Sequence, residues 1–325
     1  MNYTRIVAVV ISSSSRAAQY YTKTRPAIER FAALHRLKFL QIELNAKQLS
    51  DDELLTRKLS DRTTIARQLT DGDLAVACGG DGVAQLTFDA VYCANQSLVT
   101  GASFAVIPLG NGNDLGRALN GHKVTVRQIL QQATQPFYPL EISFQSVDTV
   151  LLFAVASYIT FGATTKLVDL LNQCDVRLRR RRLAKLSPAA ALPLKQVGVL
   201  SRAISRAKFP DFWCQDKLYR HDSVGFFTVS AAHGLLRVAR RYLFARDNFF
   251  FHLSTMADKN LVRKILTAGH WAAKFPGHFT VGETIEFRRP VDLVANLAGD
   301  NIRLIEVDKI KAVRAVRAVR VLTSR

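Results

Sequence analysis

Residues 74–82 read Leu-Ala-Val-Ala-Cys-Gly-Gly-Asp-Gly, and residues 105–117 read Ala-Val-Ile-Pro-Leu-Gly-Asn-Gly-Asn-Asp-Leu-Gly-Arg. In both stretches a short apolar run stops at a glycine turn that carries an aspartate. Apolar runs bounded by glycine are typical of buried parallel strands. Glycine also lets the backbone approach a ligand closely and direct its N–H groups at it. Because the carboxyl ends of neighbouring parallel strands meet at a crevice, the two turns together predict one phosphate-binding site.

Length and charge limit the classes of protein that this chain can represent. It has 325 residues, of which 48% are hydrophobic, so two domains with sizeable cores are expected. The formal net charge is +19. Such an excess of cations predicts an anionic partner, which can be nucleic acid, anionic lipid headgroups or a phosphorylated substrate. No nucleic-acid-binding motif accompanies the charge, so we expect no nucleic-acid partner.

The four cysteines have no zinc-like spacing and are not expected to form disulfides, which favours a reducing cytoplasm: Cys78, Cys93, Cys174 and Cys214. The N-terminus lacks the long apolar core of a signal peptide. The longest apolar stretch, residues 149–163, is shorter than the roughly 20 residues that a spanning helix needs. We therefore expect a cytoplasmic protein that is soluble or peripheral at a membrane. The sequence leaves the oligomeric state open, a homodimer included.

Strands and helices alternate through residues 1–140 and predict a doubly wound α/β nucleotide-binding domain with a parallel sheet. The expected strands are residues 5–11, 39–44, 74–79 and 105–109, and the expected helices are residues 26–36, 47–70, 83–95 and 114–119.

Strand-like segments without regular intervening helices predict a β-rich second domain over residues 141–304. The expected strands are residues 141–144, 149–161, 223–231, 249–254, 278–287 and 291–297, with helical insertions near 165–210 and 257–275. The last residues, 305–325, contain three Ala-Val-Arg triplets. A period of three fits neither a strand nor a helix well, so we expect a solvated basic strand or tail.

A basic segment between residues 171 and 209 carries ten lysines and arginines against one acid, with leucines interleaved. This pattern predicts an interfacial segment on an anionic membrane. A solvated face is the alternative. The expected membrane-binding residues are Arg177, Arg179, Arg180, Arg181, Arg182 and Lys185.

The two glycine turns resemble the motifs of the diacylglycerol kinase catalytic domain, a family of lipid kinases. The family forms are Gly-Gly-Asp-Gly-Thr followed by Pro-x-Gly-Thr-x-Asn-Asp, and residues 79–82 and 108–114 are similar to them. The resemblance implies an α/β nucleotide domain, a β-sandwich domain and a final strand that returns to the first domain. It also implies ATP and Mg²⁺ as cofactors and a lipid hydroxyl as the acceptor.

The resemblance assigns roles to individual residues. The expected nucleotide-binding residues are Arg16, Gly79, Gly80, Asp81, Gly82, Gly110, Asn111, Gly112 and Asn113. Asp81, Asp114 and Asp148 are expected to form the magnesium-linked acidic network, since Mg²⁺ prefers carboxylate and phosphate oxygens. Taken singly, each aspartate can also be a turn or cap residue.

The late motif of the chain, residues 297–300, departs from the family pattern. Ala298 stands where bacterial members carry the aspartate proposed as catalytic base, and Asp300 stands for a glutamate. Earlier departures are Val83, Gln85, Leu86 and Asn111. The proton acceptor is therefore Asp300 or Asp81, with Asp300 on the same face as residue 298 if the segment is a strand.

We predict a lipid kinase that uses ATP to phosphorylate a lipid hydroxyl such as that of diacylglycerol. A catalytically impaired lipid- or nucleotide-binding protein is the first alternative, because of Ala298. An NAD-kinase-like enzyme is the second, because such enzymes share the first glycine motif.

Overall fold

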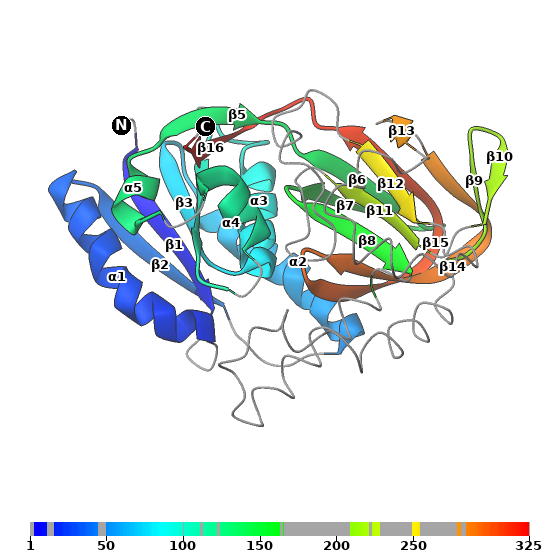
Figure 1. Cartoon of the computed structure of the whole chain (residues 1–325), viewed down its shortest axis with the longest axis horizontal. Helices are drawn as coiled ribbons and strands as arrows, with labels where there is room; N and C mark the ends of the chain where they lie inside the picture. The colour runs from blue at the N-terminus through cyan, green and yellow to red at the C-terminus, as the bar shows by residue number, and fades with distance from the viewer. Residues whose placement is uncertain are drawn as a thin grey trace.

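The computed structural model contains two β-sheets side by side, with helices mainly around the first sheet (Figure 1). The structure describes residues 3–11, 16–44, 50–99, 101–110, 113–121, 124–162, 165, 209–220, 223–227, 249–253, 278–280 and 284–324. Within these residues no helix combines the length and the apolarity needed to cross a bilayer.

The first sheet has six strands in the order β2-β1-β3-β4-β16-β5. All of them run parallel except β5, which is antiparallel to β16. Their bounds are β1 (Arg5–Ile11), β2 (Lys38–Leu44), β3 (Asp73–Gly79), β4 (Ser103–Pro108), β5 (Ala133–Phe137) and β16 (Val319–Thr323).

Helices cover both faces of this sheet, as a doubly wound arrangement requires (Figure 1). They are α1 (Arg16–Leu34), α2 (Asp51–Gln68), α3 (Asp81–Ala94), α4 (Asp114–Asn120) and α5 (Val126–Leu130). Side chains of β1 alternate between two cores, as the period of a strand dictates. Val7 and Val9 pack in one core with Phe88 of α3, while Ile6 packs in the other with Phe31 of α1.

Helix α1 begins at Arg16, whereas the sequence pattern predicted a start at Pro26. The prediction was wrong because Pro26 was taken as a first-turn residue, and it lies inside the helix instead. Upstream of it, Tyr21 is buried, and its hydroxyl lies 3.3 Å from Gln41 Oε1 of β2. Packing of this earlier turn against the sheet outweighs the backbone hydrogen bond that an internal proline removes.

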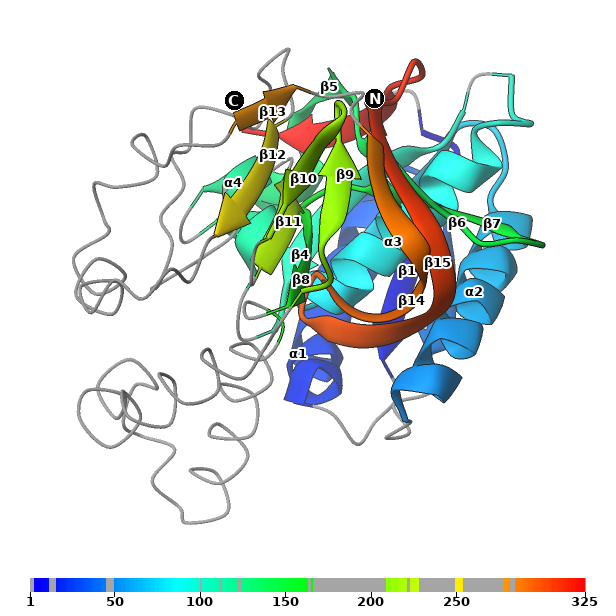
Figure 2. The same ribbon diagram turned by 90° about the vertical axis from the view of Figure 1, so that its right-hand side faces the viewer.

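The second sheet is antiparallel and has ten strands, with β13-β12-β11-β8-β14-β15-β6-β7 as its main order; β9 pairs with β14, and β10 pairs with β9. Their bounds are β6 (Leu140–Gln145), β7 (Val150–Val155), β8 (Tyr158–Gly162), β9 (Phe212–Cys214), β10 (Lys217–Tyr219), β11 (Ser223–Phe227), β12 (Phe249–Leu253), β13 (His278–Thr280), β14 (Thr284–Leu297) and β15 (Asp300–Arg314). Figure 2 shows how strongly the long hairpin of β14 and β15 bends. Register shifts between Glu286 and Leu293 mark this bend, as β-bulges do.

For residues 309–325 the basic triplets predicted a solvated strand or tail, whereas the family resemblance implied a final strand that returns to the first domain, and the structure contains that returning strand. β15 ends at Arg314, and β16 enters the first sheet between β4 and β5. Val319, Val321 and Leu322 are almost completely buried. The apolar residues between the arginines supply the core-facing positions, so β16 is an interior strand of this sheet.

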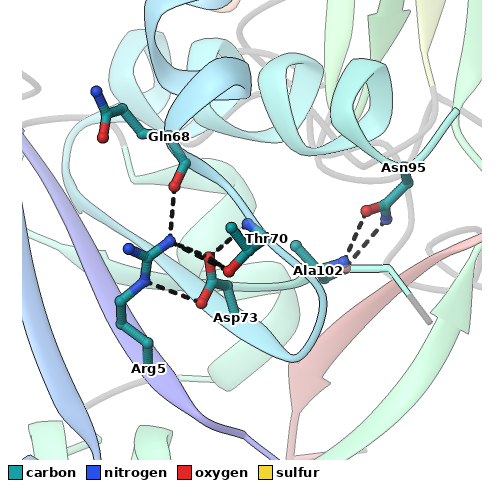
Figure 3. A network of polar contacts seen from close by, with 6 residues as sticks. All are labelled: Arg5, Gln68, Thr70, Asp73, Asn95 and Ala102. Atoms are coloured by element: carbon teal, nitrogen blue, oxygen red, sulfur yellow. Dashed lines mark hydrogen bonds and ion pairs between the residues drawn. The ribbon is translucent and has the colours of Figure 1, made fainter. Parts of the chain in front are cut away.

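A polar network fixes the amino-terminal ends of the strands, opposite the glycine turns (Figure 3). The fully buried Asp73 carboxylate receives hydrogen bonds from Arg5 at 2.6 and 3.0 Å and from the Thr70 backbone N–H at 2.7 Å. Arg5 also donates to the Gln68 carbonyl at 2.6 Å. These contacts pair a buried charge, as stability requires, so we assign the network a structural role.

Candidate active site

The two glycine turns meet at the carboxyl ends of β3 and β4. Gly79 is paired with Pro108 in the parallel ladder, and the Leu109 N–H donates to the Gly79 carbonyl at 2.9 Å. A Cβ atom on Gly110 would lie only 2.3 Å from the Gly80 Cα atom. Backbone thus packs directly on backbone, which explains the need for glycine at these positions.

Asn113 shapes the second turn. Its side chain accepts a hydrogen bond from the Gly110 N–H at 2.8 Å and donates one back to the Gly110 carbonyl. Asn113 has a φ of 58°, a left-handed conformation that asparagine tolerates better than most residues, and it precedes α4 as the N-cap. Residues 111 and 112 of this turn lie outside the described residues.

Asp81 opens α3 and reaches across to the start of α4. Its Oδ1 atom accepts the Leu115 N–H at 3.1 Å. Burial raises the pKa of Asp81 to about 7, with the nearby Asp114 carboxylate adding to the increase and the amides of Leu115, Asp114 and Asn113 opposing it. Two carboxylates held together in this way repel each other and are suited to a shared cation.

Within the described residues, no group of three or more histidines, cysteines, aspartates or glutamates is close enough to hold a metal ion. Asp148 lies exposed in the turn between β6 and β7. The structure therefore does not assemble the expected acidic network of Asp81, Asp114 and Asp148. Asp81 and Asp114 still fit Mg²⁺, because this ion is commonly held by one or two carboxylates together with waters and substrate phosphates.

Asp300 comes to this site from the second sheet. Its Oδ2 atom pairs with Lys58 Nζ of α2 at 2.6 Å. A Cβ atom on Gly82 would lie 2.5 Å from the same oxygen, so the carboxylate sits directly against the first turn of α3. Sequence reasoning named Asp300 but missed Lys58, which is one of many charges on α2 and carries no distinguishing spacing.

Ala298 does not share a strand face with Asp300, because it lies in a turn. Leu297 pairs with Asp300, and between them Ala298 and Gly299 have φ values of 50° and 98°. Positive φ at both central residues is typical of the two-residue hairpin turn of type I′. Asp300 was expected on the same face as residue 298 only if this segment is a strand. Because residue 298 lies in a turn, the two residues do not share a strand face.

Tyr158 is a further residue that the sequence analysis missed. Its carbonyl accepts the Ala298 N–H at 3.2 Å, which ties β8 to the hairpin turn. The pKa of its phenol is raised by burial and then by Asp81, Asp114 and Asp300, so the phenol lies within electrostatic reach of all three carboxylates. As the first residue of an apolar strand, Tyr158 gave no local signal of this position.

Gln85 joins the helix of the glycine turn to the second sheet. Its buried side-chain amide donates to the Ala154 carbonyl at 2.8 Å, and its side-chain oxygen accepts the Ala156 N–H at 2.9 Å. One turn later, Asp89 accepts the Ala154 N–H at 2.9 Å and pairs with Arg62 at 3.1 Å. Helix α3 thus satisfies the free edge of β7 with side chains.

Several predicted site residues lie outside what the structure describes. They are Asn111, Gly112, the side chain of Arg16 and the basic segment with Arg177, Arg179, Arg180, Arg181, Arg182 and Lys185. Their expected contacts with phosphate or membrane stay predictions.

Comparisons with known proteins agree with the sequence motifs. Residues 29–140, which include both glycine turns, match the model of the diacylglycerol kinase catalytic domain, so the resemblance to this family is confirmed for that part of the chain. No curated protein matches the sequence.

Among solved structures, the whole chain aligns with 98% of a "putative diacylglycerol kinase" from Bacillus anthracis str. Sterne, at 10% sequence identity and a TM-score of 0.55. It also aligns with 84% of a yeast NADH kinase solved with NADH, at 9% identity and a TM-score of 0.46. At such low identity the first of these matches shows a shared fold.

Proposed function

We propose that this chain is a kinase that transfers the terminal phosphoryl group of ATP to a lipid hydroxyl, with diacylglycerol as the simplest acceptor. The observation that carries the proposal is the direct backbone contact between the turns at Gly80 and Gly110, with Asp81 and Asp114 beside them. Phosphoryl transfer requires positioning and charge neutralisation more than covalent chemistry. The family match over residues 29–140 supports a kinase of the lipid kinase family.

The site offers the groups that such a reaction needs. Gly80 and Asn113 of the two turns are the N-caps of α3 and α4, and helix N-termini favour phosphate oxygens. Asp81 and Asp114 would hold Mg²⁺, which when bound neutralises the charge on the phosphates. Asp300 approaches the same turn from the second sheet and is the carboxylate placed to face an acceptor.

A peripheral location at the cytoplasmic face of a membrane is part of the proposal. Its support is the net charge of +19 and the basic, leucine-containing segment at residues 177–185. A kinase that meets its acceptor in a bilayer gains from a surface attracted to anionic lipid.

The test is transfer of labelled phosphate from ATP to a panel of acceptors in mixed micelles. The panel includes diacylglycerol, other lipid alcohols and NAD as a water-soluble acceptor. We expect label in lipid, roughly a 10²-fold or greater loss in Asp81→Ala, and full activity in Asp148→Ala, because among the described residues Asp148 forms no metal-holding group with Asp81 and Asp114. Label in NAD instead of lipid would contradict the proposal and favour an NAD-kinase-like enzyme.

A binding protein with little turnover is the second candidate, and Ala298 favours it because this side chain has no oxygen to accept a proton. This candidate predicts that ATP binds while no acceptor is labelled. An Ala298→Asp variant separates the two, since a group within reach of the acceptor hydroxyl contributes about 10²–10⁴-fold to rate. A large gain in transfer from a silent wild-type protein would identify an impaired kinase.

A further inference from the structure

Lys58 is buried to an extent that is rare for lysine. Its side chain is only 8% exposed, whereas lysine is almost never buried unless it is paired. Its partner Asp300, at 2.6 Å, keeps 41% of its side chain exposed. The ion pair therefore has a fixed, enclosed cation and a carboxylate that solvent and substrate can reach.

The pair connects parts of the molecule that are distant in sequence. Lys58 lies on α2 and Asp300 begins β15, 242 residues later. The same Asp300 oxygen that binds Lys58 Nζ lies against Gly82, immediately after Asp81. Through this ion pair Lys58 holds the Asp300 carboxylate of the second sheet beside the glycine turn that follows β3 in the first sheet.

The hairpin alone does not hold the carboxylate in this place. Asp300 follows the turn formed by Ala298 and Gly299, and an aspartate side chain there has more than one staggered rotamer open to it. A short charge-assisted hydrogen bond from an enclosed ammonium restricts that rotation. Lys58 also lies near Asp89, but Arg62 already pairs with that carboxylate at 3.1 Å.

We propose that Lys58 is a positioning residue for phosphoryl transfer, which holds the Asp300 carboxylate above Gly82 so that Asp300 receives the proton of the acceptor hydroxyl. The inference rests on the proposed kinase function. As the acceptor oxygen forms its bond to the terminal phosphorus, the bond from phosphorus to the bridging oxygen breaks, and its electron pair leaves with ADP. The hydroxyl proton passes to the Asp300 carboxylate, and Lys58 keeps its own protons throughout.

The experiment is a double-mutant cycle of kcat and KM with Lys58→Met, Asp300→Asn and the combined variant. Arg57→Met is the matched control, because Arg57 is the adjacent cation on α2, keeps 40% of its side chain exposed and pairs with Asp61 of the same helix. We expect Asp300→Asn to lower kcat by about 10²-fold or more, in the range typical of a proton acceptor. Lys58→Met should lower kcat by about tenfold or more, with KM for ATP unchanged, and Arg57→Met should match the wild type.

The combined variant decides between positioning and separate effects. If Lys58 acts through Asp300, the combined variant should be as slow as Asp300→Asn alone. The inference would be overturned if the loss of kcat in the combined variant equalled the product of the two single losses. A normal kcat in Lys58→Met would overturn it as well. Lys58→Arg covers the case in which Lys58→Met does not fold, since arginine keeps the positive charge. Lys58→Arg should lower kcat at an unchanged unfolding temperature. An unaffected kcat in Lys58→Arg would also overturn the inference. A wild-type protein that labels no acceptor would instead refute the proposed function itself.

Discussion

The raised pKa of Asp81 predicts a stability that depends on pH, and replacing this residue by asparagine should remove that dependence. In the folded protein burial and the Asp114 carboxylate raise the pKa of Asp81 to about 7, from an ordinary value of 3.8. The fold therefore favours the protonated, neutral form. For such a group the unfolded state loses its proton first as pH rises, so the free energy of unfolding falls between pH 4 and pH 7.

The size of the effect follows from the pKa difference. A difference of about three units, at about 1.4 kcal/mol per unit, gives a loss of about 4 kcal/mol by pH 8. Asparagine has the shape of the neutral carboxylic acid and its side-chain oxygen can still accept the Leu115 N–H. We therefore expect Asp81→Asn to exceed the stability of the wild type by only about 1 kcal/mol at pH 4.5 and by up to about 4 kcal/mol at pH 8.

The assay is urea denaturation of both proteins at several pH values between 4.5 and 8, followed by circular dichroism. The comparison at pH 4.5 is the internal control for any change in packing. Adding MgCl₂ at pH 8, against NaCl of equal ionic strength, should stabilise the wild type and leave Asp81→Asn unchanged, because the ion needs the carboxylate. Stability differences that stay constant across this pH range would refute the reasoning.

Three further predictions concern the contacts around the site and the basic segment. Gln85→Leu should lower the free energy of unfolding by about 2–5 kcal/mol in urea denaturation, because two buried backbone groups, one of them the Ala154 carbonyl, lose their partner. Gly110→Ala should destabilise the protein by about 1–3 kcal/mol or more by the same measurement, whereas Gly80→Ala, whose nearest contact is 3.3 Å, should cost less. Replacing residues 179–182 by serine should weaken cosedimentation with anionic vesicles and abolish its salt dependence, because each basic residue near an anionic surface contributes about 1 kcal/mol to binding. Equal binding of the wild type to neutral and anionic vesicles would count against a membrane role.

Local sequence was sufficient to predict the glycine turns because their determinants are local. The apolar run that starts at Leu74 and ends at Gly79 specifies both a buried strand and the point where it stops. The same holds for β4 and for Asn113, whose side chain closes its own turn. Such contacts span at most a few residues, so a pattern in the chain is enough to reveal them.

Contacts between distant segments could not be predicted in this way. Lys58 and Asp300 meet only because α2 packs beside the β14–β15 hairpin, and nothing in either segment indicates the other. Asp148 illustrates the opposite case, since the family resemblance grouped it with Asp81 and Asp114, whereas it lies in an exposed turn and these three acids form no metal-holding group among the described residues. The Ala-Val-Arg triplets alone suggested a solvated tail because their arginines hid the apolar residues that β16 buries, whereas the family resemblance already implied a strand that returns to the first domain.

Residues of two sheets can form one site here only if the sheets keep a fixed relative position, and α3 supplies that connection. Asp81 and Gln85 lie one turn apart on this helix, so the helix that presents a carboxylate to the glycine turns also holds β7. A short turn after β7 leads to Tyr158, whose carbonyl holds the Ala298 N–H at 3.2 Å. The hairpin then returns Asp300 to Gly82, next to Asp81, which closes a ring of contacts. Any shift of β7 along α3 would therefore move the proposed proton acceptor relative to the phosphate turn, which couples the packing of the two sheets to the chemistry of the site.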